Sequence, residues 1–211
     1  MIRVIICDDH PIVREGVRMI IQKQKDISIE EEAASGQELI SRLASRGCDV
    51  IVLDICLPGG QDGIELLKTL SRDYPKIPVL VMSMHAESQL GMRAIRAGAS
   101  GYLVKGSEPA ELLTAIRKLG AGGKYISPSL AERLAEEVSG KRARPAYEKL
   151  SDREYRVLCL LASGKGVSEI AAELFLSPAT VGTYRSRVLS KLNLNNTAEL
   201  VRYAVEHGLL D

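Results

Sequence analysis

The stretch Val50-Ile51-Val52-Leu53-Asp54 joins four consecutive apolar residues to a carboxylate. A short apolar run that is rich in β-branched residues predicts a strand buried on both faces, as in a parallel sheet covered by helices. Similar runs alternate with amphipathic stretches through the first 120 residues. The expected strands span 4–7, 27–33, 50–53, 79–82 and 101–104, and the expected helices span 11–23, 37–44, 64–71, 88–97 and 109–119.

This alternation predicts an α/β domain with a five-stranded, parallel, doubly wound (flavodoxin-like) sheet. The carboxyl ends of parallel strands meet at one edge of the sheet, where ligands of such folds bind. Polar residues directly follow four of the expected strands: Asp8 and Asp9, Asp54, Ser83, and Lys105. The sequence therefore predicts one pocket with three carboxylates, a hydroxyl group and an amine.

Three neighbouring carboxylates repel one another unless a cation joins them, and oxygen ligands favour Mg²⁺. In such a pocket Asp54 would act as a nucleophile that forms an aspartyl phosphate. Mg²⁺ and Lys105 would offset the charge on the phosphoryl oxygens, and Ser83 would donate a hydrogen bond. A single Asp at a strand end is ordinarily a turn or helix cap. The prediction depends on the whole set.

From residue 150 onward the hydrophobic period is helical, with expected helices at 152–162, 168–174, 178–192 and 197–206. Ser177 suits the N-cap of the third helix, and Pro178 suits its first position. Only a tight turn, residues 175–177, separates the second helix from the third. We expect an all-α four-helix domain with a helix-turn-helix whose second helix reads DNA.

The helix over 178–192 should direct Val181, Tyr184, Val188 and Leu192 toward the core of its domain. Small polar residues on the opposite arc would let the helix approach base edges, and Arg187 is the candidate for a guanine contact. The expected DNA contacts are Thr180, Gly182, Thr183, Arg185, Ser186, Arg187 and Lys191. Solvated surface charges, or a helical protein-interaction domain, are the alternative interpretations.

These patterns place one domain at 1–122, a linker with a helix over 129–138 at 123–148, and a second domain at 149–211. The basic stretch 139–145 is interpreted as a solvated tether, with neutralisation of DNA phosphates as the alternative. Residues 1–140 carry 17 basic and 19 acidic side chains, a balance of −2. Residues 141–211 carry 11 and 8, a balance of +3, which weakly favours nucleic acid at the second domain.

Neither a targeting segment nor a membrane span is expected, because the first apolar run ends at Asp8. Four scattered cysteines without ligand spacing indicate reduced packing thiols in the cytoplasm rather than a zinc site. The cysteines are Cys7, Cys48, Cys56 and Cys159.

Residues 1–120 resemble the receiver domain of two-component systems. The matching stretches are 4–10, 52–54, Leu57-Pro58, Ser83 and 101–105. The resemblance implies that Asp9, Asp54 and the backbone carbonyl of Cys56 bind Mg²⁺ and that Asp8 acts through water. It also implies that Ser83 and Tyr102 form a switch pair, although a half-buried packing ring is the alternative for Tyr102.

The sequence departs from the receiver pattern in the loop after Asp54. Gly63 stands nine residues after Asp54, whereas the family places a glycine eight residues after the acceptor. We therefore expect a one-residue insertion in this loop. Cys56 and His85 lie near the expected path of attacking water and would tune the lifetime of the phosphoryl group.

Residues 150–211 resemble the output domain of the NarL/FixJ (LuxR-type) response regulators, and the ending 205–209 and the stretch 177–184 are most similar to the GacA/UvrY branch. The matching stretches are 150–154, Val157-Leu158, Gly164, 169–171, Leu174, 176–178, Thr180-Val181 and Lys191-Leu192. Gly182 is a departure, since many members carry Lys or Asn there. The resemblance implies a sensor histidine kinase, promoter DNA bound by a phosphorylated homodimer, RNA polymerase as a further partner, and dimer contacts from the helix over 197–206.

Two other classes of protein were weighed. A hydrolase with an aspartyl-phosphate intermediate usually carries a second Asp two residues after the nucleophile, but Cys56 stands there. A constitutive DNA-binding protein would not need the full charged set around Asp54. We therefore expect that the protein is not an enzyme, apart from catalysing its own phosphorylation and dephosphorylation. We also expect that it does not associate with a membrane.

Overall fold

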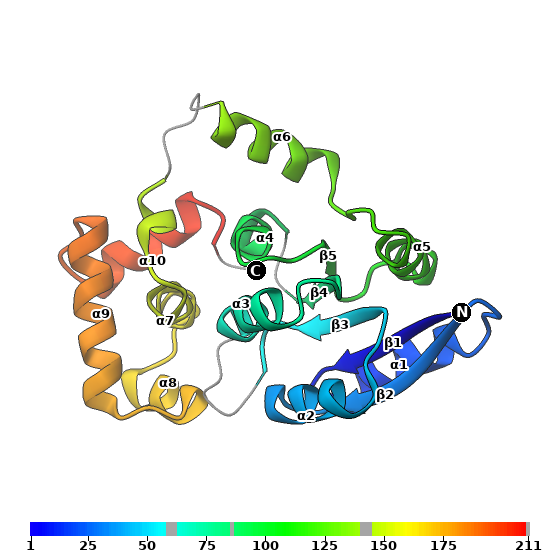
Figure 1. The fold of residues 1–211 in the computed structure, drawn as a ribbon. Coiled ribbons are helices and arrows are strands. Elements are labelled where there is room, and N and C mark those ends of the chain that lie inside the picture. The colour runs from blue at the N-terminus through cyan, green and yellow to red at the C-terminus, as the bar shows by residue number, and fades with distance from the viewer. Residues whose placement is uncertain (58–62, 85–86, 140–144, 210–211) are drawn as a thin grey trace. The chain divides into compact units, whose positions relative to one another are not determined.

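The computed structural model describes residues 1–57, 63–84, 87–139 and 145–209 (Figure 1). The chain divides into two compact units, Met1–Glu132 and Arg133–Asp211. None of the described helices is long and apolar enough to cross a membrane.

The first unit is built on a parallel sheet in the order β2-β1-β3-β4-β5. Its strands are β1 (Ile2–Cys7), β2 (Ile27–Ala33), β3 (Val50–Asp54), β4 (Val79–Ser83) and β5 (Gly101–Val104). Strand β3 is buried along its whole length. The order is that of a doubly wound sheet, so the predicted fold class is confirmed.

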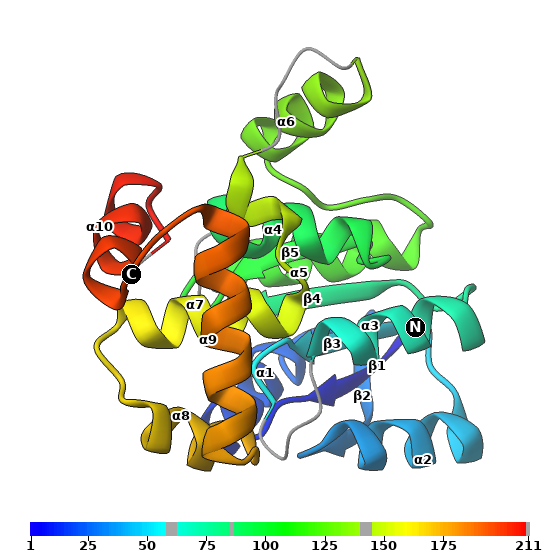
Figure 2. The same cartoon turned by 90° about the vertical axis from the view of Figure 1, so that its left-hand side faces the viewer.

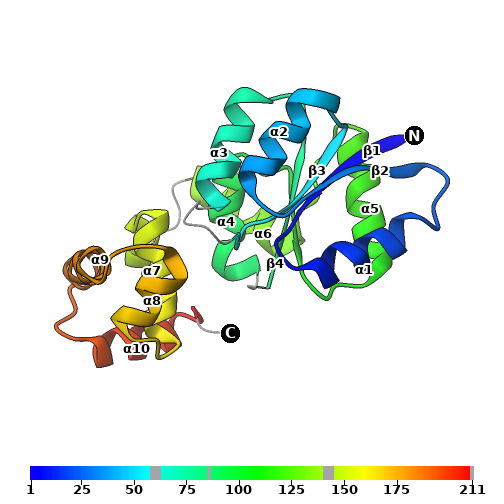
Figure 3. The ribbon, with the colours of Figure 1, turned by 90° about the horizontal axis from the view of Figure 1, so that it is seen from below.

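Helices cover both faces of this sheet (Figure 3). On one face, α1 (Pro11–Ile21) and α5 (Pro109–Gly120) bury residues such as Val17 and Ile116 against the strands. On the other face, α2 (Gly36–Arg46), α3 (Gly63–Asp73) and α4 (Glu87–Arg96) pack around Leu39, Leu67 and Ala94. Burial on both faces explains why the strands read as continuous apolar runs.

The expected elements of this unit are all present, and their ends differ from the predicted ends by two residues or fewer. Strands β3 and β4 continue through Asp54 and Ser83, because both residues still pair with the neighbouring strand. Asp54 and Ser83 are thus held by the ladder itself rather than by a loop.

A short segment after α5 returns to the edge of the sheet, which the sequence did not predict. Tyr125 pairs with Gly101 in an isolated parallel bridge, and the Tyr102 N–H donates to the Tyr125 carbonyl at 3.0 Å. The chain then enters α6 (Pro128–Val138), where Leu130 is buried near Gly91 of α4.

In the described part of the second unit, a short 3-10 turn, η1 (Ala146–Lys149), precedes four α-helices (Figure 2). They are α7 (Asp152–Ala162), α8 (Val167–Leu174), α9 (Pro178–Leu192) and α10 (Thr197–Glu206). The predicted four-helix domain is confirmed. The predicted linker residues 140–144 lie outside the described residues, and the domain bounds at 122 and 149 stay predictions.

Local chemistry fixes the start of α9. The Ser177 side chain accepts a hydrogen bond from the Thr180 N–H at 3.0 Å, and Pro178 occupies the first helical turn. The turn begins at Phe175, directly after α8. Phe175 has a φ of 55°, a left-handed conformation that is costly for a bulky residue. This turn joins α8 to α9 as the helix-turn-helix prediction requires.

Candidate functional site

The acidic pocket lies at the carboxyl ends of β1 and β3. Asp8 directly follows β1, and Asp54 is the last residue of β3. The order of the sheet reverses at β1, and ligands of doubly wound folds bind at such a reversal. Both carboxylates are almost fully buried, Asp8 at 2% and Asp54 at 1% exposure.

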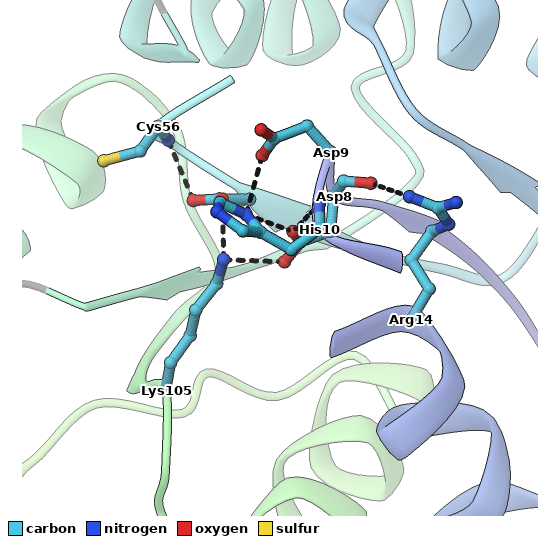
Figure 4. Close-up of polar contacts among 7 residues, drawn as sticks. Asp8, Asp9, His10, Arg14, Cys56 and Lys105 are labelled. Atoms are coloured by element: carbon cyan, nitrogen blue, oxygen red, sulfur yellow. Dashed lines mark hydrogen bonds and ion pairs between the residues drawn. The ribbon is translucent and has the colours of Figure 1, made fainter. Parts of the chain in front are cut away.

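Lys105 joins the two carboxylates across the sheet edge. Its Nζ lies 2.7 Å from Asp8 Oδ2 and 2.6 Å from Asp54 Oδ2 (Figure 4). The Lys105 N–H donates to the Ser83 carbonyl at 2.7 Å, which holds this residue beside the end of β4. Burial works against the charged ammonium, but the hydrogen bonds to Asp54 and Asp8 outweigh it and raise the pKa of Lys105.

The second oxygen of Asp54 is held by the backbone. Asp54 Oδ1 accepts a hydrogen bond from the Cys56 N–H at 2.8 Å. Burial raises the pKa of Asp54, while Lys105 and the Cys56 N–H act in the opposite direction. The carboxylate is therefore fixed in orientation, taken out of water and close to a positive charge, which suits a nucleophile for an anionic phosphoryl group.

The residues present fit a divalent cation. Ligand atoms of Asp8, Asp9, His10 and Asp54 all lie within 4.8 Å of one another. Asp9 Oδ1 is buried and accepts no hydrogen bond of acceptable geometry from any residue that the structure describes. Because a buried carboxylate oxygen needs a partner, this oxygen supplies a place for a cation.

Backbone contacts hold Asp8 in place. The His10 N–H donates to Asp8 Oδ1 at 2.9 Å, and Arg14 of α1 donates to the Asp8 carbonyl at 2.6 Å (Figure 4). The His10 ring also lies at the pocket, with Nδ1 2.9 Å from Asp9 Oδ1. The sequence prediction gave His10 no role, although its position directly after the acidic pair placed it at this edge.

Ser83 is the last residue of β4, and Tyr102 lies in β5, the next strand of the sheet. Ser83 is fully buried at the end of β4, one residue beyond the partner of Asp54 in the ladder. Tyr102 is 2% exposed and belongs to the core on the α2–α3–α4 face of the sheet. Their predicted switch role remains a prediction.

Steric constraints explain why a glycine stands at position 63, after Asp54. A Cβ added to Gly63 would lie 2.1 Å from the Ile55 carbonyl oxygen, so only glycine fits at the start of α3. Residues 58–62, where the sequence predicts an inserted residue, and His85 lie outside the described residues. Cys56 is half-buried, and its N–H donates to Asp54 Oδ1, while its predicted roles toward Mg²⁺ and attacking water stay predictions.

Helix α9 has the buried and exposed faces that its sequence predicts. Val181, Val188 and Leu192 are buried, and Tyr184 is half-buried. Thr183, Ser186 and Arg187 are exposed on the other side, while Thr180 and Gly182 are intermediate. The Thr183 hydroxyl donates to the Ala179 carbonyl at 3.0 Å and retains acceptor capacity.

Two basic residues of α9 are engaged within their own unit. Lys191 Nζ lies 2.6 Å from Oε2 of Glu154, a residue that is only 3% exposed in α7. Arg185 Nε donates to the Thr197 hydroxyl at 3.0 Å. These contacts, from residues far away in the sequence, were not predicted. They leave Arg187 as the exposed basic side chain at the middle of the helix.

Comparison with known proteins identifies both units. Residues 4–117 match the response regulator receiver domain, and residues 148–204 match the bacterial regulatory proteins of the luxR family. The response regulator UvrY of Escherichia coli K12 is 34% identical over 99% of this chain and 96% of its own length. The response regulator GacA of Pseudomonas viridiflava is 35% identical over 100% of this chain and 99% of its own.

Solved structures of RcsB from Salmonella resemble the whole chain. RcsB bound to the promoter rprA in the presence of the phosphomimetic BeF₃⁻ has a TM-score of 0.67 and 29% identity, and the match covers 96% of this chain and 97% of RcsB. Another structure, at a TM-score of 0.60 and 29% identity, holds two RcsB dimers on two parallel DNAs; the match covers 97% of this chain and 98% of that one.

Proposed function

The chain belongs to the response regulators that carry a receiver domain and a DNA-binding domain of the luxR family, like UvrY and GacA, and we propose that it accepts a phosphoryl group on Asp54 and then binds promoter DNA as a homodimer. The observation that carries the proposal is the buried Asp54 carboxylate, which Lys105 and the Cys56 N–H hold between them. A capping residue would not need a buried cation from another strand end.

The donor in this proposal is a phosphohistidine of a sensor kinase. The Asp54 carboxylate forms a P–O bond while the P–N bond of the donor breaks, and the released imidazole keeps the electron pair and takes up a proton. Lys105 remains beside the new phosphoryl group and offsets its negative charge. Ser83, at the end of β4, then donates its hydroxyl hydrogen bond to that group.

Asp9, Asp54 and the Cys56 carbonyl would hold Mg²⁺, and Asp8 would contribute through water. Asp9 Oδ1 supports this assignment, because it is buried and accepts no hydrogen bond of acceptable geometry from the described residues. Bound Mg²⁺ supplies positive charge that stabilises the phosphoryl oxygens during transfer. The chain acts only on its own aspartyl group in this scheme, so it is a transcription factor rather than an enzyme with an outside substrate.

Repacking around Ser83 and Tyr102 would change the surface of the receiver and favour dimer formation. The dimer would then place α9 of each copy in the major groove of one half-site. Arg187, Thr183 and Ser186 would face the DNA, Gly182 and Thr180 would allow its close approach, and Arg185 and Lys191 would lie near phosphates. RNA polymerase would be the final partner, in the cytoplasm.

The function is tested by selecting bound sequences from a random double-stranded DNA library, with and without acetyl phosphate and Mg²⁺. Phosphodonor should raise the affinity of the full chain for the selected DNA at least about tenfold, and D54N should show no increase. An equal increase in D54N would mean that the response does not depend on Asp54, and the proposal would be wrong.

A further inference from the structure

His10 lies at the mouth of the acidic pocket, where none of the steps above uses it. Its Nδ1 is 2.9 Å from Asp9 Oδ1 and 3.2 Å from Asp8 Oδ1 (Figure 4). The His10 side chain is 58% exposed and the Asp9 side chain 24%, so the ring lies at the solvent-exposed side of this carboxylate. Pro11 follows at the first position of α1 and fixes the backbone next to it.

We infer that His10 is a ligand that determines which divalent cation the pocket prefers, because its imidazole adds a nitrogen to an otherwise all-oxygen site. The inference rests on the proposed cation site at Asp9 and Asp54. In an octahedral site with bonds of about 2.1 Å, neighbouring ligand atoms are about 3 Å apart. The 2.9 Å distance from His10 Nδ1 to Asp9 Oδ1 matches such a ligand-to-ligand edge.

The other contacts of the carboxylates leave this side of the pocket available. Lys105 holds the Oδ2 atoms of Asp8 and Asp54, and the Cys56 N–H holds Asp54 Oδ1. The oxygen nearest to the His10 ring is Asp9 Oδ1, which is buried and has no hydrogen bond of acceptable geometry from the described residues. A cation between Asp9 and His10 would satisfy that oxygen without displacing Lys105.

A nitrogen ligand changes selectivity because cations differ in the donors they accept. Mg²⁺ binds oxygen almost exclusively, whereas Ni²⁺ and its neighbours in the first transition row bind imidazole well. His10 should therefore add affinity for Ni²⁺ and little for Mg²⁺. An isolated hydrogen bond from the His10 ring to Asp9 would have no such selectivity.

Two substitutions separate ligation from positioning. His10→Ala removes the ring entirely, and His10→Asn keeps an N–H donor for Asp9 but lacks the imidazole. Asp9→Asn serves as the control for cations bound elsewhere on the chain. Mg²⁺ and Ni²⁺ affinities of the unphosphorylated full chain are measured by calorimetry for all four proteins. Pulsed electron paramagnetic resonance of bound Mn²⁺ detects any directly coordinated nitrogen.

We expect the Ni²⁺ affinity to fall at least about tenfold in both His10 variants, with the Mg²⁺ affinity changed less than about threefold. The nitrogen signal of Mn²⁺ should be present in the unmodified chain and lost in both variants. An unchanged ratio of Ni²⁺ to Mg²⁺ affinity, a full rescue by His10→Asn, or a missing nitrogen signal would overturn the role of His10. Mn²⁺ binding that survives Asp9→Asn would instead overturn the cation site itself.

Discussion

Lys105 Nζ lies 2.6 Å from Asp54 Oδ2, so the residue after the last strand neutralises the residue that ends the central strand. The same amine reaches Asp8 Oδ2, and side-chain exposure is 6% for Lys105 and 1% for Asp54. A buried cation shared between two carboxylates makes the pocket a single electrostatic unit.

Lys105→Met should lower the free energy of unfolding by about 3 kcal/mol at pH 8 in EDTA, because two buried carboxylates lose their cation. Burial already raises the pKa of Asp54, and the loss of Lys105 would raise it further. A carboxyl group with a raised pKa is destabilising above that pKa and less so below it. The deficit should therefore shrink toward pH 5, and also when Mg²⁺ is added at pH 8.

Urea unfolding of the two proteins at both pH values makes this measurement. Lys124→Met is the matched control, since Lys124 is an exposed lysine whose Nζ donates a hydrogen bond to the Ser100 hydroxyl at 3.1 Å. A deficit that stays the same at pH 5 and pH 8 would argue against the shared-cation account.

Gly63→Ala should destabilise the receiver by more than about 2 kcal/mol, because the new Cβ would meet the Ile55 carbonyl oxygen at 2.1 Å. The clash lies next to Asp54, so phosphorylation should slow as well. Gly182→Ala is the control, since a Cβ there meets nothing within 4 Å and alanine favours the interior of α9 by about 1 kcal/mol. Thermal unfolding of both variants should show a lower unfolding temperature for Gly63→Ala and a higher one for Gly182→Ala.

Glu154→Gln should remove part of the stability that the second unit loses as the pH falls. Burial works against the Glu154 carboxylate, but hydrogen bonds from Lys191 and Ser151 outweigh it and lower its pKa. A group with a lowered pKa stabilises the fold above its ordinary pKa of about 4.3, and this stability is lost as the pH falls through the lowered value. The variant should lose about 1 kcal/mol at pH 7 and less at pH 3.

The control for this pH profile is Glu169→Gln. Glu169 makes the same capping contact to the first turn of α8, with its Oε2 2.7 Å from the Gly166 N–H, but it is exposed. Both substitutions keep an oxygen acceptor at the cap, so only the charge differs. If Glu169→Gln changed the profile as much as Glu154→Gln, the buried pair with Lys191 would not be its source.

Arg187→Ala should weaken binding to the selected DNA. If Arg187 contacts a phosphate, the salt dependence of binding should fall by about one phosphate contact. If it contacts a guanine, the binding free energy should fall by about 1–3 kcal/mol. Lys191→Ala should act mainly on stability, because Glu154 already holds the Lys191 amine. Fluorescence anisotropy at several salt concentrations, with urea unfolding alongside, separates the two effects. Equal DNA affinity of Arg187→Ala and the unmodified chain would remove Arg187 from the interface.

Much of the fold could be predicted because its signals are local. The apolar run before Asp54, the N-cap Ser177 and Pro178 at the first helical position each specify an element from neighbouring residues alone. The pocket could be predicted because parallel topology brings strand ends together, so the position of each residue relative to its strand was enough.

The unpredicted features depend on contacts between distant parts of the chain. Tyr125 pairs with Gly101 through backbone groups, and the sequence around Tyr125 shows no strand alternation. Lys191 and Glu154 stand 37 residues apart, so the pattern of α9 alone indicated a DNA contact or a solvated charge at Lys191 and not this ion pair. The turn at Ala146–Lys149 is too short to show a hydrophobic period.

The most direct test of the central claim is to map the phosphorylated residue. The full chain is incubated with Mg²⁺ and a small phosphodonor, and the modified peptide is sequenced by mass spectrometry after rapid reduction of the aspartyl phosphate with borohydride. We expect one modification, at Asp54, that disappears in D54N and in the presence of EDTA. Labelling at another residue of the unmodified chain, or labelling that survives D54N, would contradict it.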